Sequence, residues 1–205
     1  LTFRQFLERC DRWSSALQAL GVGQGDRVVY IAPNTDNHLE GYYAVPQIGA
    51  VLVPINYRLL PADFEYIINH SGAKIVCVHP DYIDAVDSIR PQLPGVTHFV
   101  ALEGAGKGWI DYESMLAAHG PDFRKVEIAE TDLITINYTS GTTARPKGVL
   151  HAHRSALGRQ PMYQGWYGIR SDDRMLHAGA FNWTFTLGVG LTDPWANGAT
   201  AIVCI

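Results

Sequence analysis

Four short apolar runs in the first half of the chain constrain its fold more than any other feature. Segments with helical spacing of apolar residues separate them, and the runs are Arg27–Ala32, Val51–Ile55, Lys74–Val78 and Val96–Leu102. Runs that are apolar on both faces suit strands buried between two layers. The alternation of strands and helices therefore predicts an α/β fold with mostly parallel sheets covered by helices.

The first helix carries a clear start signal. Thr2 and Gln5 form a T-x-x-Q capping box. The apolar residues that follow recur at helical spacing: Phe3, Phe6, Leu7, Cys10, Trp13, Leu17 and Leu20. We expect the aromatic residues among them to be core residues and not a ligand site. A second helix, from Asp36 toward Gly49, should be kinked at Pro46.

Composition and charge exclude several classes of protein. The chain has 205 residues and a net charge of -4, so nothing indicates nucleic acid or an anionic membrane as a partner. No apolar run approaches the ~20 residues of a membrane span. Cys10, Cys77 and Cys204 lie far apart in apolar surroundings, which favours buried thiols in a reducing compartment, and we expect a cytoplasmic protein. The chain opens on Leu1 inside a helical pattern, so we also expect a truncation; the oligomeric state stays open.

The stretch from Ile134 to Arg154 contains the strongest functional signal. It starts with apolar, strand-like residues and then changes to TSGTTARPKG at Thr139–Gly148, with four hydroxyls, two glycines, a proline and two cations. Glycines let backbone N–H groups approach phosphate oxygens, hydroxyls donate to them, and lysine supplies a compact positive charge. The alternative is a surface turn rich in Ser, Thr and Gly.

The order of these residues differs from a Walker A loop, G-x-x-x-x-G-K-[ST]. Counted from Gly141, the lysine has the spacing of the motif. However, Pro146 replaces the second glycine of the motif, and Gly148 replaces its final Ser or Thr. The chain is therefore not expected to be a P-loop nucleotide hydrolase, although the loop suits the same polyanion. His151 and His153 are two apart, which would direct them to different sides of a helix, so a metal pair is not expected.

The loop resembles the phosphate-binding loop of the adenylate-forming (AMP-binding) superfamily, whose pattern is close to [ST]-S-G-[ST]-[ST]-G-x-P-K-G. Ala144 replaces a glycine of that pattern. GDRV at Gly25–Val28 and GAVLVPINYRL at Gly49–Leu59 also resemble the family's N-terminal region, so the resemblance covers essentially the whole chain. It implies the N-terminal portion of an ATP-dependent carboxylate–CoA ligase, most like an acyl-CoA or aryl-CoA synthetase. A non-catalytic phosphate- or nucleotide-binding fragment, or the adenylation domain of another adenylate-forming enzyme, are the alternatives.

The resemblance also implies which residues contact the phosphates of ATP: Thr139, Ser140, Gly141, Thr142, Thr143, Ala144, Lys147 and Gly148. Among them, Lys147 would stabilise phosphate charge during catalysis, whereas Arg145 should face solvent. We expect a negative φ at Ala144, because positive φ is uncommon for a residue with a Cβ. The run His177–Trp183 matches the family's acyl pocket, so Phe181 and Trp183 are candidate substrate-binding residues; otherwise they are core aromatics.

The resemblance also implies which co-substrates the complete protein uses and how the chain divides into subdomains. ATP, Mg²⁺ and coenzyme A would act with a small-molecule carboxylic acid, fatty or aromatic, and most of their sites would lie beyond residue 205. No metal ligand is therefore assigned in this chain, and the 205-residue chain alone is not expected to adenylate acids. We expect residues 1–130 to form a partial N-terminal α/β subdomain. Residues 131–205 should form a second, truncated α/β subdomain that carries the phosphate loop.

Overall fold

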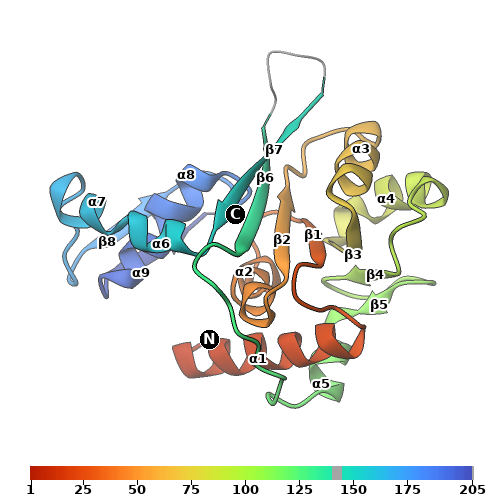
Figure 1. Ribbon diagram of the computed structural model, residues 1–205, viewed down its shortest axis with the longest axis horizontal. Coiled ribbons are helices and arrows are strands. Elements are labelled where there is room, and N and C mark those ends of the chain that lie inside the picture. Colours follow the sequence, from red (N-terminus) through yellow and green to blue (C-terminus); the bar gives the residue numbers. More distant parts are fainter. Residues whose placement is uncertain (140–144, 205) are drawn as a thin grey trace.

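A computed structural model describes residues 1–139 and 145–204, which form two sheets with helices packed around them (Figure 1). The larger sheet has seven strands in the order β5-β4-β3-β1-β2-β6-β7. Their bounds are β1 Arg27–Ile31, β2 Val51–Ile55, β3 Ala73–Val78, β4 His98–Ala101, β5 Ile110–Asp111, β6 Leu133–Thr139 and β7 Lys147–Ala152. All neighbours are parallel except β6 and β7, which are antiparallel. This confirms the predicted, mostly parallel α/β fold.

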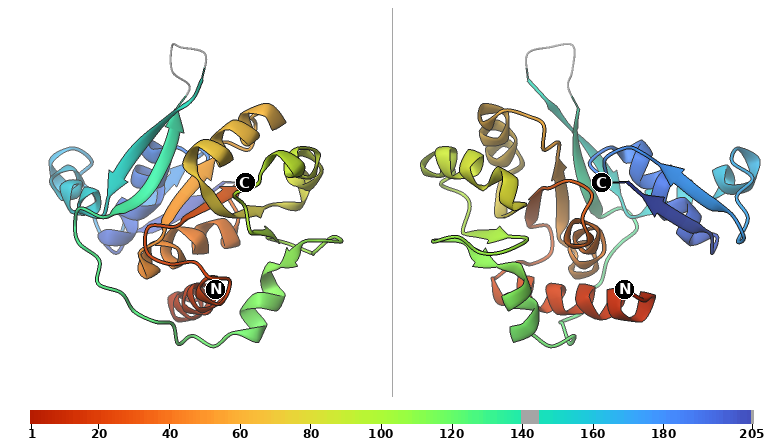
Figure 2. Two further views of the ribbon diagram at one scale, coloured as in Figure 1. Left: turned by 45° about the vertical axis from the view of Figure 1, so that its right-hand side comes forward. Right: turned by 180° about the vertical axis from the view of Figure 1, so that it is seen from behind.

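Helices cover both faces of this sheet because its inner strands are apolar on both sides. One face packs against α1 (Phe3–Ala19), α2 (Asp36–Ala44) and α5 (Tyr112–Ala118), and the other against α3 (Pro61–Ser71) and α4 (Ile83–Ile89), as Figure 2 shows from two sides. Strand β1 illustrates the alternation. Val28 and Tyr30 belong to the first core, whereas Val29 and Ile31 belong to the second.

The predicted start of α1 is confirmed, but the prediction for its aromatic residues holds only in part. Thr2 and Gln5 form both hydrogen bonds of the capping box. Trp13 is fully buried, and its indole N–H donates to the hydroxyl of Tyr30 at 2.7 Å. Phe3, however, is 70% exposed. The first turn of α1 extends past the sheet toward α9, so the ring of Phe3 packs only on the edge of Trp195, with 5.3 Å between ring centroids.

Residues 119–132 form no helix or strand and lead along α1 to β6. The side chain of Gln18 on α1 donates to the backbone oxygen of Arg124 at 2.7 Å and accepts from its N–H at 2.8 Å. Strand β6 then pairs with β2, through Leu52 and Thr135, so β6 and β7 extend the sheet of the preceding residues. The division into 1–130 and 131–205 stays a prediction.

A smaller lobe follows β7 in the chain (blue in Figure 1). Strands β8 and β9 pair in parallel, and short helices surround them: β8 Arg174–His177, β9 Thr200–Val203, α6 Arg154–Gly158, α7 Gln160–Gly165, α8 Thr184–Leu187 and α9 Asp193–Ala196. A π-helical turn joins α8 to α9, so the expected helix between Thr184 and Trp195 is present but irregular. No helix within residues 1–139 and 145–204 combines the length and hydropathy that crossing a bilayer requires.

Candidate functional site

The two ends of the phosphate-type loop lie opposite each other at one end of the β6–β7 hairpin. Thr139 is the last residue of β6 and pairs in antiparallel register with Lys147, the first residue of β7. Both are exposed. The strand therefore begins at Lys147, one residue before the expected end of the loop at Gly148. Five of the residues predicted to contact phosphate lie outside the residues that the structure describes: Ser140, Gly141, Thr142, Thr143 and Ala144. The expected negative φ of Ala144 therefore stays a prediction.

Gly148 is held close to β6. A Cβ at this position would lie 3.0 Å from Cγ2 of Ile136 and 3.3 Å from Cζ of Tyr138, so a larger residue would push the two strands apart. Gly148 thus has a packing role that needs no ligand. Its predicted contact with phosphate stays a prediction.

Helix α3 braces the hairpin on both sides of the loop. The hydroxyl of Tyr138, one residue before Thr139, hydrogen-bonds Nδ1 of His70 at 2.7 Å. Partial burial raises the pKa of Tyr138 to about 12, so the hydroxyl stays protonated and can donate to the imidazole. After the loop, the guanidinium of Arg145 lies 5.1 Å from the ring centroid of Tyr66. Arg145 is exposed, as expected, but its side chain is also stacked on α3.

The loop leaves the sheet at the edge where the parallel strands end. In open α/β sheets, ligands bind outside the carboxyl ends of the strands. Asn34 follows β1 at the same edge, and its side-chain N–H groups donate to the backbone oxygens of Gly179 and Cys204 at 2.9 and 2.8 Å. Asn137 of β6 donates to the backbone oxygen of Asn182 at 3.4 Å. These bonds bring residues 179–182 of the small lobe beside the hairpin that carries the loop.

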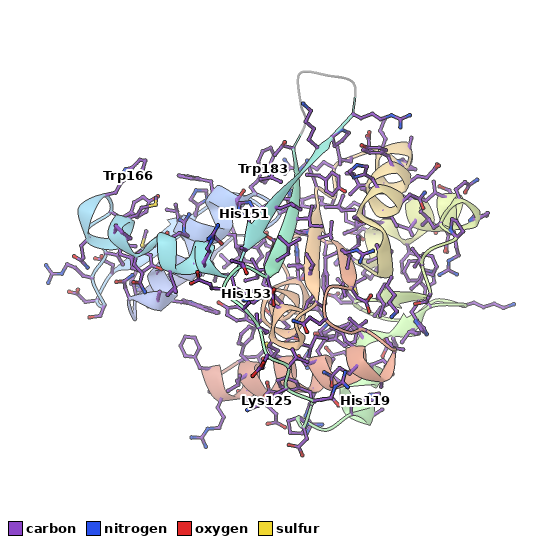
Figure 3. All side chains as sticks on the ribbon, in the orientation of Figure 1. His119, Lys125, His151, His153, Trp166 and Trp183 are labelled. Carbon is purple, nitrogen blue, oxygen red and sulfur yellow. The ribbon has the colours of Figure 1, made fainter. Side chains whose placement is uncertain are left out.

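The structure separates the two candidate substrate-binding aromatics. Phe181 is 3% exposed and packs against the rings of His38 and Tyr42, so it occupies a core position. Trp183 is 58% exposed, and Figure 3 shows it beside the β6–β7 hairpin. Of the two side chains, Trp183 is the one that a ligand can reach. His177 ends β8, and its Nδ1 accepts the N–H of Gly179 at 3.2 Å, as expected for a strand-end histidine.

A largely apolar cavity of about 770 Å³ lies between the large sheet and the small lobe, and Thr184 and Phe185, which follow Trp183 in the chain, line it. Its walls come from α1, α2, β6, β7, α6 and α8, and include Leu7, Tyr43, Ile134, Thr135, Thr184 and Phe185. Arg159 lines it as well and forms an ion pair with the fully buried Asp193. The cavity can accept a hydrocarbon group, with polar groups of Thr135 and Thr184 on its wall.

The sequence argument against a metal pair at His151 and His153 assumed that both residues lie on one helix, and this assumption is wrong. His151 lies in β7 and not in a helix, whereas His153 follows the end of that strand and directly precedes α6. Both side chains line the apolar cavity, and Figure 3 shows them on the same side of β7. Burial lowers the pKa of His153. Within residues 1–139 and 145–204, no group of three or more His, Cys, Asp or Glu residues could hold a metal ion. No ligand for Mg²⁺ is therefore assigned here.

Sequence reasoning missed Asn34, Tyr42 and Asn137, the side chains that tie the small lobe to the large sheet. Tyr42 donates its hydroxyl to the backbone oxygen of Phe181 at 2.6 Å. A signal for Asn34 was available, since a polar residue directly after a buried parallel strand lies at the ligand-binding edge. Tyr42 and Asn137 look like ordinary helix and strand residues, and their contacts cross more than forty positions of the sequence.

Known proteins share this arrangement. The family model for "AMP-binding enzyme" matches residues 1–205. The long-chain-fatty-acid–CoA ligase of Thermus thermophilus is 41% identical over 157 residues, which cover 76% of this chain and 28% of that protein. The 3-hydroxybenzoate/4-hydroxybenzoate–CoA ligase of Thauera aromatica is 31% identical over 205 residues, covering 99% of this chain and 39% of that protein.

Solved structures agree with the sequence relatives. The anthranilate–CoA ligase AuaEII, solved in complex with anthranoyl-AMP, superposes with a TM-score of 0.95 at 30% identity, over 100% of this chain and 40% of its own. The inhibitor-bound N-terminal domain of FACL13 from Mycobacterium tuberculosis superposes with a TM-score of 0.89 at 29% identity, over 100% of this chain and 50% of its own. The fold is thus that of the N-terminal part of these CoA ligase structures. The chain belongs to the AMP-binding enzyme family, and it spans well under half the length of these two curated relatives.

Proposed function

We propose that this chain is the N-terminal portion of an ATP-dependent carboxylate–CoA ligase. The observation that carries the proposal is the position of the phosphate-type loop. It leaves the carboxyl edge of a parallel sheet with Lys147 exposed at its base. The same hairpin lines, through Ile134, Thr135 and His151 toward its other end, an apolar cavity that a carboxylic acid could enter. The two curated relatives described above are both CoA ligases, one named for fatty acids and the other for hydroxybenzoates.

In the proposed reaction, a carboxylate oxygen of the acid attacks the α-phosphorus of ATP. A P–O bond forms, the bond to pyrophosphate breaks, and an acyl-adenylate results; the thiol of coenzyme A then displaces AMP to give the acyl-CoA. Charge grows on the phosphate oxygens during the first step, so donors and cations fixed beforehand lower its barrier. Lys147 and Thr139, which pair at the two ends of the loop, would take this role.

The acid is proposed to lie between Trp183 and the apolar cavity. Thr184 and Phe185, which follow Trp183, already line that cavity. The carboxylate would face the loop, and the hydrocarbon part would extend along the apolar walls. Among the described lining residues, Lys, Asp and Glu are absent, and the guanidinium of Arg159 is paired with Asp193, although His151 and His153 also line the cavity. An uncharged tail, aliphatic or aromatic, therefore suits the cavity better than a dicarboxylic acid.

The test is acid-dependent exchange of labelled pyrophosphate into ATP. It requires this chain within a protein of its relatives' length, assayed with fatty, aromatic and dicarboxylic acids. We expect exchange with at least one monocarboxylic acid, followed by acyl-CoA formation when coenzyme A is added. Exchange with no acid, or exchange that gains nothing from added acid, would remove the ligase assignment.

A further inference from the structure

The side chain of Asn34 forms three hydrogen bonds with the backbone of the small lobe. Its two N–H groups donate to the oxygens of Gly179 and Cys204, and its Oδ1 accepts the N–H of Phe181 at 2.8 Å. Asn34 is 8% exposed, so these bonds are shielded from water. Gly179 and Cys204 lie just beyond β8 and β9, so one side chain joins the carboxyl ends of both sheets.

The segment held in this way has little freedom to move. A Cβ at Gly179 would lie only 2.2 Å from Oγ1 of Thr186, so the backbone there is packed directly against α8. Tyr42 holds the backbone oxygen of Phe181, and Asn137 holds that of Asn182. Trp183 is the next residue and directly precedes α8. Its indole N–H forms no hydrogen bond within the described part of the chain.

We propose that Asn34 is a positioning residue, which fixes residues 179–183, and Trp183 with them, relative to Thr139 and Lys147. The proposal rests on the proposed function, since it assumes that Trp183 contacts the acid. Without the three bonds of Asn34, the small lobe could shift against the hairpin while each sheet stays folded. A shift of about 1 Å between reacting groups can lower a rate by ~10²-fold. ATP phosphates bound at the hairpin would be affected much less.

The test uses Asn34→Ala and Asn34→Asp in the full-length ligase. Aspartate keeps the acceptor for the N–H of Phe181 but sets an oxygen against the backbone oxygens of Gly179 and Cys204. We expect kcat/KM for the acid to fall by about 10-fold or more in both variants, while KM for ATP changes by less than about 3-fold. Amide hydrogen exchange at Phe181 should become faster in both.

Asn37→Ala is the matched control. Asn37 is the same residue type, 7% exposed, and its side chain donates a single bond to the backbone oxygen of Leu102 at 2.9 Å, away from residues 179–183. It should lower the melting temperature without changing KM for the acid or the exchange of Phe181. If Asn34→Ala behaves like Asn37→Ala in both measurements, the positioning role is overturned.

The two proposals fail in different ways. If the unchanged protein activates no acid, the proposed function is lost, but amide exchange at Phe181 still decides the role of Asn34. If acids are activated and Phe181 exchanges at the same rate in wild type and Asn34→Ala, the positioning role is wrong and the ligase assignment stands.

Discussion

Lys147 and Gly148 are neighbours in β7, yet the structure gives them different constraints. The side chain of Lys147 is exposed at the base of the loop and is available to a ligand. Gly148 faces Ile136 and Tyr138 across the hairpin, and a Cβ there would lie 3.0 Å from Cγ2 of Ile136, closer than an ordinary van der Waals contact. Lys147 is thus accessible to a ligand, whereas Gly148 allows the close approach of β6 and β7 at the base of the loop.

Replacing Lys147 with alanine should lower the rate of acid-dependent pyrophosphate release by at least ~10-fold, because a charge-assisted contact worth ~1.4 kcal/mol or more is lost. The measurement is made in the full-length protein at saturating acid. Lys125→Ala is the control, since Lys125 is also exposed but lies far from the hairpin (Figure 3). An unchanged rate and unchanged ATP affinity in Lys147→Ala would remove its assigned role.

Gly148→Ala should destabilise the protein by about 1–3 kcal/mol, because the new methyl group overpacks the hairpin. Chemical unfolding of the variant and the wild type measures the difference. Gly158→Ala is the matched substitution, since a Cβ at Gly158 in α6 meets no atom within 4 Å. Equal stability of the Gly148 and Gly158 variants would contradict the packing argument.

At the scale of elements, α3 and β6 work together. Alternate residues of β6 face opposite sides: Ile136 and Tyr138 pack toward the core under α3, whereas Thr135 and Asn137 face the small lobe. His70 and Tyr66 of α3 contact Tyr138 and Arg145, which flank the loop. The loop is therefore attached to the large sheet at both of its ends by contacts with one helix.

Tyr138→Phe removes the hydroxyl that bonds His70 and keeps the ring. We expect a loss of about 0.5–1.5 kcal/mol of stability, concentrated in the hairpin, because that hydrogen bond is partly shielded from water. Amide exchange in β6 and β7 should become faster, while exchange in β1 and β3 stays the same. Tyr163→Phe is the control, because it removes no side-chain hydrogen bond of the described part of the chain. If amide exchange in β6 and β7 became equally fast in Tyr163→Phe, the Tyr138–His70 bond would not be what stabilises the hairpin.

At the scale of the whole molecule, a buried histidine lies where the large sheet, α2 and the small lobe meet. His38 is fully buried, stacked between the rings of Tyr30 and Tyr42, with Phe181 at its edge. Its Nδ1 bonds the backbone oxygen of Pro33 at 3.0 Å, and its Nε2 finds no partner in the described residues. Burial disfavours the charged imidazole and lowers the pKa of His38 to about 4.

This pKa predicts a loss of stability in mild acid. The unfolded histidine titrates near 6.5, so between about pH 6.5 and pH 4 the unfolded state binds a proton that the folded state does not. The stability contributed by neutral His38 is complete above that window and is lost as pH falls through it. From pH 7 to pH 5, the free energy of unfolding should drop by about 2 kcal/mol through this group.

The check is chemical unfolding at pH 7 and pH 5 for wild type, His38→Asn and His119→Asn. Asparagine at position 38 keeps a donor for Pro33 but does not titrate, so that variant should be less stable at pH 7 and lose about 2 kcal/mol less on acidification. His119→Asn is the control for the substitution itself, since His119 bonds the backbone oxygen of Met115 and lies outside the His38 cluster. Identical pH dependence in all three proteins would rule out His38 as its source.

Local signals in the sequence were enough to predict the family and most of the helices and strands. Runs that are apolar on both faces, such as Val51–Ile55, are shielded from water only when a layer covers each face. The order TSGTTARPKG at Thr139–Gly148 is a local pattern that indicates the family. Local signals of this kind involve residues close in the chain, so they can be read without a model of the fold. The capping box at Thr2 and the strand leading to Thr139 were predicted for the same reason.

The tertiary structure decided which residues meet. Phe181 and Trp183 carry the same sequence signal, but the bonds of Asn34 and Tyr42 bury the first and leave the second exposed. His151 and His153 line one cavity, although the first lies in β7 and the second lies between β7 and α6. Contacts such as Asn34 with Phe181 join residues 147 positions apart. Their partners are chosen by how the two sheets pack, and no local pattern in the chain records that choice.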